Sequence, residues 1–139
     1  MFDAKMIFVP SGAKNGAQFE PPRPLVTCRM LLPSPLLYNN VLYMVNDGGI
    51  VTSFNPATGE VIKQGRLTGA LGNYFASPVA ADNHVFFASQ PGVIAVLNPD
   101  GDLTPLVVNP LNEDIYATPA VADGRIYVRT TVALWAFGK

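Results

Sequence analysis

The sequence predicts an all-β fold made of repeated units of four antiparallel strands, and three observations support this. One local sequence occurs three times, as "SPLLYNNVLYMV" (34–45), "SPVAADNHVFFAS" (77–89) and "TPAVADGRIYVRT" (118–130). The copies begin 43 and 41 residues apart. No segment shows sustained helical periodicity, and 13 prolines interrupt the windows in which a helix could form.

Each copy opens with a Ser-Pro or Thr-Pro step, called the anchor below, followed by a short apolar segment. A polar pair then ends that segment, and such pairs tolerate the positive φ of a tight hairpin turn. The three pairs are Asn39-Asn40, Asp82-Asn83 and Asp123-Gly124. A β-rich strand is predicted after each of them, at 41–45, 85–89 and 126–130.

A second turn and two further strands complete the unit. The turn is Asp47-Gly48-Gly49 in the first copy and Gln90-Pro91-Gly92 in the second. Third strands are predicted at 50–54, 93–97 and 132–137. An Asn-Pro step then begins a reversal, in which Pro fixes φ and Gly supplies a left-handed residue. The reversals, "NPATGE" and "NPDGD", lead to fourth strands predicted at 61–67 and 103–108.

A period of about 42 residues with four strands per unit predicts a β-propeller, in which each sheet is one blade. Blades are expected at about 34–67, 77–108 and 118–139, and the third lacks a fourth strand. The competing fold is a β-sandwich, whose strands recur about every 8 to 12 residues. A sandwich, however, gives no reason to use one local sequence three times.

Three blades are too few for a ring, since propellers have about four to eight. Residues 25–31, "LVTCRML", are predicted to be a blade-closing strand, and residues 1–24 an extension or linker. Two arrangements remain open. In one, two half-propellers form a C2 dimer and residues 25–31 of each chain finish the partner's third blade. In the other, the chain is the C-terminal part of a longer propeller.

The composition excludes several classes of function. Nine Lys and Arg stand against ten Asp and Glu without a basic cluster, which argues against binding to nucleic acid or anionic membranes. No stretch approaches the roughly 20 apolar residues of a transmembrane helix. The single cysteine, Cys28, allows neither an internal disulfide nor a Cys-based zinc site and is interpreted as an apolar filler. At 49% hydrophobic and 14% charged residues, the chain is apolar for a small soluble protein, so either its apolar faces are buried against another chain or it is part of something larger.

The segments "SPVAADNHVFFAS", "TPAVADGRIYVRT" and "FNPATGEVI" resemble the PQQ-like repeat family of β-propellers. This family contains quinoprotein alcohol dehydrogenases and scaffolds of the BamB type, so the resemblance implies the fold more strongly than a function. In the enzymes, a motif of the form Ala-x-Asp-x-x-Thr-Gly-x-x-x-Trp ties neighbouring blades together through its Trp. Here Thr58-Gly59 match, Asn55 replaces the Asp, and Lys63 stands where the Trp belongs. The only tryptophan, Trp135, lies elsewhere in the repeat and is predicted to pack in the core.

The sequence predicts no catalytic, cofactor-binding or metal-binding residues. By resemblance, PQQ and calcium are the expected cofactors of a catalytic relative, whose vicinal cysteine pair this chain cannot form. Its carboxylates are scattered over hairpin tips, at Glu60, Asp82, Asp100, Asp102 and Asp123, where turn formation explains them. Glu113-Asp114 is interpreted as a solvated charge pair, and His84 has no second histidine. Ser34, Ser77 and Thr118 are expected to bond local backbone, because no nucleophile motif surrounds them.

We therefore predict a non-enzymatic propeller module with a protein-interaction or scaffold role. The alternatives are a quinoprotein oxidoreductase fragment or relic, and a propeller that binds glycans or polymers. The candidate interaction rim is formed by Asn73 and Tyr74 in one loop and by Asp114 and Tyr116 in the equivalent loop, with Phe75 matching Tyr116. The expected partners are a second copy, the rest of a longer propeller or an unknown protein. The family resemblance implies a location outside the cytoplasm.

Overall fold

The computed structural model describes residues 33–46 and 48–138, and its regular secondary structure within these residues is entirely β. Eleven strands form three separate sheets. The first sheet contains β1 (Leu36–Tyr38), β2 (Val41–Asn46), β3 (Ile50–Phe54) and β4 (Val61–Arg66). The second contains β5 (Val79–Ala81), β6 (His84–Ala88), β7 (Val93–Leu97) and β8 (Pro105–Pro110). The third contains β9 (Ala120–Ala122), β10 (Arg125–Arg129) and β11 (Leu134–Gly138).

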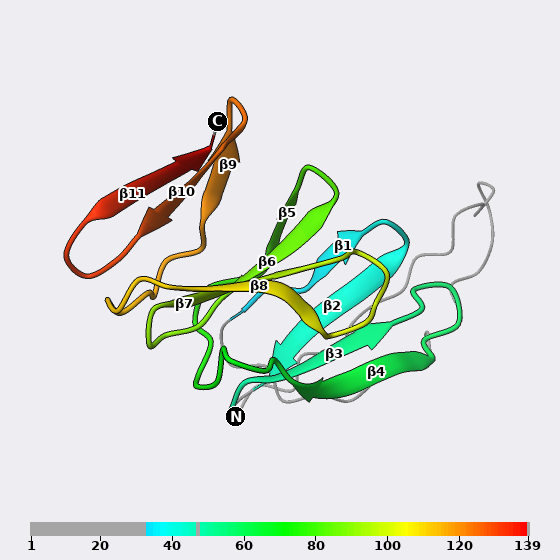
Figure 1. The fold of residues 1–139 in the computed structure, drawn as a ribbon. Coiled ribbons are helices and arrows are strands. Elements are labelled where there is room, and N and C mark those ends of the chain that lie inside the picture. The colour runs from blue at the N-terminus through cyan, green and yellow to red at the C-terminus, as the bar shows by residue number, and fades with distance from the viewer. Residues whose placement is uncertain (1–32, 47, 139) are drawn as a thin grey trace, which may run out of the picture.

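Each sheet is an antiparallel meander in which neighbouring strands follow each other along the chain. Figure 1 shows the three sheets in chain order, with the second sheet between the first and the third. The predicted architecture of two complete blades and one partial blade is therefore confirmed. We call the sheets blade 1, blade 2 and blade 3. The predicted closing strand 25–31 and the extension 1–24 lie outside the described residues.

Two predicted strands begin later than expected. β11 begins at Leu134 and not at residue 132, because the Thr130 hydroxyl accepts bonds from the amides of Val132 and Ala133 and holds them in the turn. β8 begins at Pro105 and not at residue 103, because Leu103 is buried in the seam between blades 1 and 2. In both cases a side-chain contact determines where the strand begins, and the alternation of residues along the strand does not predict that contact.

The first hairpin of every blade uses the backbone conformation that the polar pairs predict. Asn39 and Asn40 have φ of 48° and 59°, Asp82 and Asn83 have 47° and 57°, and Asp123 and Gly124 have 50° and 70°. Two consecutive positive φ values give the turn whose twist matches that of the flanking strands. The short strands β1, β5 and β9 thus fold back directly onto β2, β6 and β10.

The anchors join the blades at their innermost strands. The backbone N–H of Ser34 donates to the Ser77 hydroxyl at 2.7 Å, and the N–H of Ser77 donates to the Thr118 hydroxyl at 3.0 Å. β1 contacts β5, and β5 contacts β9. These hydroxyls do bond backbone, but the prediction that the bonds are local was wrong, because the partner residue lies in the neighbouring blade.

Apolar side chains fill the space between consecutive blades. Between blades 1 and 2, Tyr43 meets Phe87 edge-to-face with ring centroids 6.1 Å apart, and Val45, Val51 and Leu97 are almost fully buried around them. Between blades 2 and 3, a smaller cluster contains Ala88, Ile94, Ile115 and Val128. The first seam is therefore packed more extensively than the second.

A polar turn also closes the first seam. The turn between β7 and β8 reaches across to blade 1, where the Gly101 N–H donates to the Tyr43 hydroxyl at 3.2 Å and the Ser53 hydroxyl donates to the Gly101 carbonyl at 2.6 Å. Lys63 forms an ion pair with Asp102 of the same turn. Lys63, at the position where the resemblance places the Trp, therefore does link blade 1 to blade 2. The link is an ion pair between two half-exposed side chains.

Candidate interaction rim

The loops predicted to form the rim are held together by backbone hydrogen bonds that repeat from blade to blade. The Gln90 N–H donates to the Asn73 carbonyl at 2.7 Å, and the equivalent Thr131 N–H donates to the Asp114 carbonyl at 2.9 Å. The Ile115 N–H donates in turn to the Gln90 carbonyl at 3.0 Å. Two loops 41 residues apart in the sequence therefore lie at one end of the blades, both bonded to the β6–β7 turn.

Close backbone packing at two turn glycines makes this arrangement rigid. Gly92 in the β6–β7 turn has φ +85°, and a Cβ there would overlap the Glu113 carbonyl oxygen. The equivalent Gly49 has φ +74°, and its Cβ would overlap the Gly72 carbonyl oxygen. Only glycine combines this conformation with so close an approach. Each turn is thus seated against the loop that leads into the following blade.

Three side chains at the rim form a closed polar cluster, which we call the rim cluster: Gln90, Asp114 and Tyr116. The Gln90 amide donates to Asp114 Oδ2 at 3.0 Å and lies 3.3 Å from the Tyr116 hydroxyl. That hydroxyl donates to Asp114 Oδ2 at 3.3 Å. The Tyr116 ring packs on Phe75 with centroids 5.3 Å apart and planes inclined by 35°. The carboxylate, the amide and the ring are therefore fixed relative to one another.

The structure brings together some of the predicted rim residues and separates one. Asp114 is half-buried, Tyr116 is exposed, and Asn73 is exposed and joined to them through the backbone of Gln90. Tyr74 does not lie on the rim surface, because its side chain is only 6% exposed and its hydroxyl donates to the Ala70 carbonyl. Burial raises the pKa of Tyr74 well above its ordinary value. It packs inside the first seam and is not available to a partner.

Gln90 is the residue that sequence reasoning missed. It was interpreted only as part of a turn, yet it bonds both rim loops through its backbone and its side chain. The repeat did contain a signal that Tyr74 is buried. Tyr74 occupies the position of the apolar Ile115 in the next unit, and both side chains are buried. Equivalence between blades therefore predicts burial better than residue type at this position.

A second polar cluster lies beside the first and involves Glu113. The Thr130 hydroxyl donates to Glu113 Oε2 at 2.6 Å, and the Trp135 indole N–H donates to the same oxygen at 3.0 Å. These two hydrogen bonds hold the pKa of Glu113 below its usual value. Glu113 and Asp114 are both half-buried, and each is bonded to neighbouring side chains, which their interpretation as a solvated charge pair did not include. The prediction that Trp135 packs in the core was wrong, because its side chain is 38% exposed and stacks on Phe137.

A shallow groove of about 290 Å³ adjoins the rim cluster. Its lining comprises Tyr116, Ala117, Arg129, Thr130 and Thr131. Arg129, which is exposed, thus lines the same groove as Tyr116. Tyrosine and arginine are among the residue types enriched where protein–protein binding energy is concentrated.

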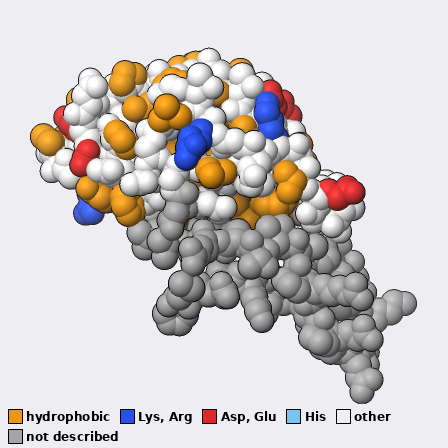
Figure 2. Space-filling view, turned by 90° about the horizontal axis from the view of Figure 1, so that it is seen from below, with side chains coloured by type: hydrophobic (Ala, Val, Ile, Leu, Met, Phe, Trp, Pro, Cys, Tyr) orange, Lys and Arg blue, Asp and Glu red, His pale blue; other side chains and the backbone are white. Residues whose placement is uncertain are grey.

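The part of the chain that the structure describes holds no cluster of potential metal ligands. No group of three or more His, Cys, Asp and Glu that could hold a metal ion occurs within 33–46 and 48–138. His84 bonds the Asp82 carbonyl of its own hairpin at 2.6 Å. On the face in Figure 2, Lys and Arg side chains lie singly among other residues and form no basic patch. No helix in the part of the chain that the structure describes is long and apolar enough to span a membrane.

The fold and the repeated seams define a β-propeller segment of the PQQ-like repeat type. A protein-family model described as "Outer membrane protein assembly factor BamB" matches residues 23–135, so the chain belongs to this family. No curated protein matches the chain.

Solved structures share the fold. BamB from Moraxella catarrhalis superposes with a TM-score of 0.62 at 21% identity, over 75% of this chain and 32% of that one. Quinohemoprotein alcohol dehydrogenase from Comamonas testosteroni gives 0.59 at 14% identity, over 75% and 18%. A computationally designed protein, Ika8, gives 0.58 at 16%, over 76% and 32%. The match thus spans a third or less of each of these proteins.

Proposed function

We propose that this chain is a non-enzymatic protein-binding module that engages its partner through the rim cluster and the adjoining groove. The observation that carries the proposal is the preorganised set of the half-buried Gln90 and Asp114 and the exposed Tyr116. Its side chains bond one another and its loops are fixed by the bonds between blades. Because these side chains are already held in one arrangement, binding a partner would cost them little conformational entropy.

The chemistry of the rim favours a polypeptide segment with hydrogen-bond donors and an acidic residue. The Asp114 carboxylate can accept further bonds from backbone or side-chain amides. The half-exposed Tyr116 ring supplies an apolar platform, and Arg129 supplies a guanidinium fork for a carboxylate. The rim cluster and the groove together offer both signs of charge beside one aromatic ring, which matches the composition of protein-binding sites.

Membership of the BamB family supports a role of the same kind. The family description names an outer membrane protein assembly factor, and a scaffold in such an assembly binds other proteins without chemical turnover. We extend this role to the present chain as a proposal, together with a location outside the cytoplasm. The other partner predicted from the sequence, a second copy or the rest of a longer propeller, would complete the blades.

Site-specific photo-crosslinking tests the rim. A benzophenone amino acid replaces Asn73, which is exposed beside the cluster, and in a control it replaces Asp123 at the opposite end of blade 3. In cells that express the protein, position 73 is expected to give a discrete adduct that position 123 does not. The adduct should weaken at least tenfold when Asp114→Ala or Tyr116→Ala is added. Equal adducts from both positions, or an adduct that ignores both substitutions, would refute the proposal.

A further inference from the structure

The loop that leads from blade 1 into blade 2 exposes a leucine at the same end of the blades as the rim cluster. Leu71 is 61% exposed, although Ala70 and Tyr74 of the same loop are buried. It lies two residues before Asn73, whose carbonyl accepts the bond from the Gln90 N–H. Single exposed leucines are common on protein surfaces, so the surroundings of Leu71 decide whether it has a role.

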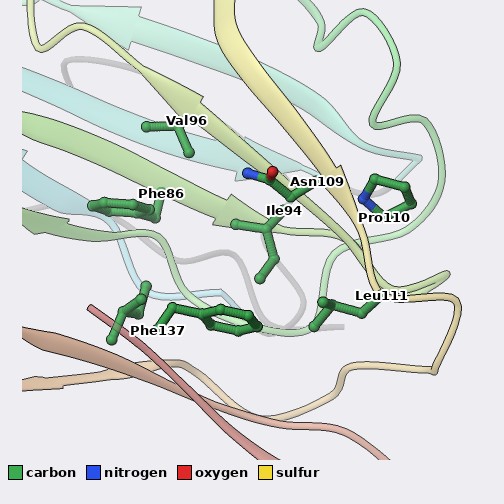
Figure 3. Close-up of a pocket in the computed structure, with 8 residues that line it drawn as sticks. Phe86, Ile94, Val96, Asn109, Pro110, Leu111 and Phe137 are labelled. Atoms are coloured by element: carbon green, nitrogen blue, oxygen red, sulfur yellow. The ribbon is translucent and has the colours of Figure 1, made fainter. Parts of the chain in front are cut away.

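The repeat shows that the fold does not require an apolar residue at this position. The equivalent loop lies 41 residues later, so Ala70 corresponds to Leu111 and Leu71 corresponds to Asn112. Figure 3 shows Leu111 extending between blades 2 and 3 toward Ile94, which belongs to the cluster that Leu111 packs against. Asn112, the next residue, is exposed. The first position of each pair therefore packs between blades, and the second faces solvent whether it is Leu or Asn.

Pro91 extends the apolar surface beside Leu71. Gly72, the residue after Leu71, lies so close to the Pro91 ring that a Cβ on it would be 2.8 Å from both Cγ and Cδ of the ring. Pro91 is exposed and directly follows Gln90 of the rim cluster. Leu71 and Pro91, which we call the apolar patch, thus belong to the two segments that meet at the hydrogen bond between Gln90 and Asn73. The apolar patch and the rim cluster are therefore adjacent.

The backbone beneath the apolar patch is held from two sides. A Cβ on Gly49 would overlap the Gly72 carbonyl oxygen, and the Pro91 ring contacts Gly72 from the other segment. Gly72 itself has φ +128°, a conformation that glycine adopts far more readily than other residues. Leu71 is thus presented on fixed backbone, and a leucine side chain loses only modest rotamer entropy when it is buried.

We propose that the partner of the rim packs an apolar side chain on the apolar patch while it bonds to the rim cluster. This inference rests on the proposed function and adds the chemistry of the partner, a polypeptide segment with an apolar residue beside the group that donates to Asp114. Residues 67–73 and 89–93 carry no charge, so a charged residue placed on the patch would lose hydration without gaining an ion pair. An apolar centre bordered by hydrogen-bonding groups is the usual composition of a protein-binding site.

Truncating Leu71 in the crosslinking experiment tests the apolar patch. The benzophenone amino acid stays at Asn73 and Leu71→Ala is added, which should weaken the adduct about tenfold through the lost aliphatic contact. Leu71→Met keeps an apolar side chain of similar size and should restore most of the adduct. Leu37→Ala is the matched control, because Leu37 is 62% exposed on β1 and the equivalent residue of blade 2 is Ala80. This control should leave the adduct unchanged.

Leu71→Asn is a second variant that the repeat itself makes compatible with the fold. It places at position 71 the residue that occupies the equivalent exposed position, Asn112. Because an exposed side chain is exchanged, the Tm of Leu71→Asn and of Leu71→Ala should stay within about 2 °C of the wild type. Leu71→Asn should nevertheless weaken the adduct as much as Leu71→Ala does, since both remove the aliphatic contact.

The outcomes separate this inference from the proposed function. An adduct at position 73 that depends on Asp114 and Tyr116 but withstands Leu71→Ala and Leu71→Asn would overturn the inference and leave the rim site standing. Equal weakening by Leu71→Ala and Leu37→Ala would also overturn it, because the loss would not be specific to the apolar patch. If position 73 gives no adduct beyond that of position 123, the proposed function fails and the inference fails with it.

Discussion

Replacing Gly92 by alanine tests whether the blades are docked through their turns. The new Cβ would overlap the Glu113 carbonyl oxygen and lie 2.8 Å from its amide nitrogen and 2.9 Å from its carbonyl carbon. The Glu113 backbone cannot easily move away, since the Thr131 N–H bonds the adjacent Asp114 carbonyl and the Leu111 N–H bonds the Gly92 carbonyl. The substitution should therefore push blade 2 away from the loop that opens blade 3.

Gly124→Ala is the matched control for this substitution. Gly124 also has positive φ, +70°, but a Cβ there meets nothing within 4 Å. Both variants share the left-handed penalty of about 1 kcal/mol and the same change in unfolded-chain entropy. Only Gly92→Ala adds overpacking, which costs about 1–3 kcal/mol. We expect Gly124→Ala to lose about 1 kcal/mol of unfolding free energy and Gly92→Ala about 2–4 kcal/mol.

Urea denaturation followed by circular dichroism measures this difference. For a chain of 139 residues, each kcal/mol corresponds to roughly 3–4 °C in Tm, so a thermal melt should separate the variants by at least several degrees. The reasoning is refuted if Gly92→Ala costs no more than Gly124→Ala, because the close approach between blades would then contribute nothing.

Two further predictions concern described contacts, and a third concerns the quinoprotein alternative. Tyr74→Phe should lower the unfolding free energy by about 1–2 kcal/mol, because the buried hydroxyl donates to the Ala70 carbonyl; a change below about 0.3 kcal/mol in urea denaturation would contradict this. Glu113→Gln should remove a pH-dependent part of stability: the pKa of Glu113 is lowered in the fold, so its contribution is complete above the ordinary value of 4.5 and is lost as the pH falls through the folded value. The unfolding free energy of the wild type should therefore exceed that of Glu113→Gln above pH 4.5, and the difference should shrink as the pH falls through the lowered pKa. A difference that does not change with pH would refute the assignment. Adding PQQ with Ca²⁺ should produce neither bound-cofactor absorbance nor dye-linked alcohol oxidation, and stoichiometric binding would reopen the quinoprotein alternative.

The repeat predicted most of the fold because its information is local. Asn39-Asn40 and Asp82-Asn83 determine their hairpins through their own backbone preference, and the alternating strands on either side follow from these turns. The third unit was correctly predicted to lack a fourth strand among the described residues, because only its first three strands repeat. Strand boundaries differed by at most two residues.

The site was predicted less well because its side chains depend on neighbouring blades. Tyr74 looked like a surface aromatic in its loop, and it is buried because blades 1 and 2 close over it. Trp135 looked like a core residue, and it lies at the surface with its indole bonded to Glu113. The residues around Gln90 gave no indication of its role at the rim, because its hydrogen-bond partners lie in loops 17 and 24 residues away in the sequence. Periodicity within one strand does not contain such contacts.

Nuclear Overhauser effects across the anchors test the propeller arrangement most directly. If the three sheets fan out from adjacent inner strands, the Ser34 amide proton lies close to the Ser77 side chain, and the Ser77 amide proton close to the Thr118 side chain. We predict that both cross-peaks are observed in the folded chain. Their absence, with cross-peaks connecting the faces of two stacked sheets in their place, would show a sandwich and contradict the account.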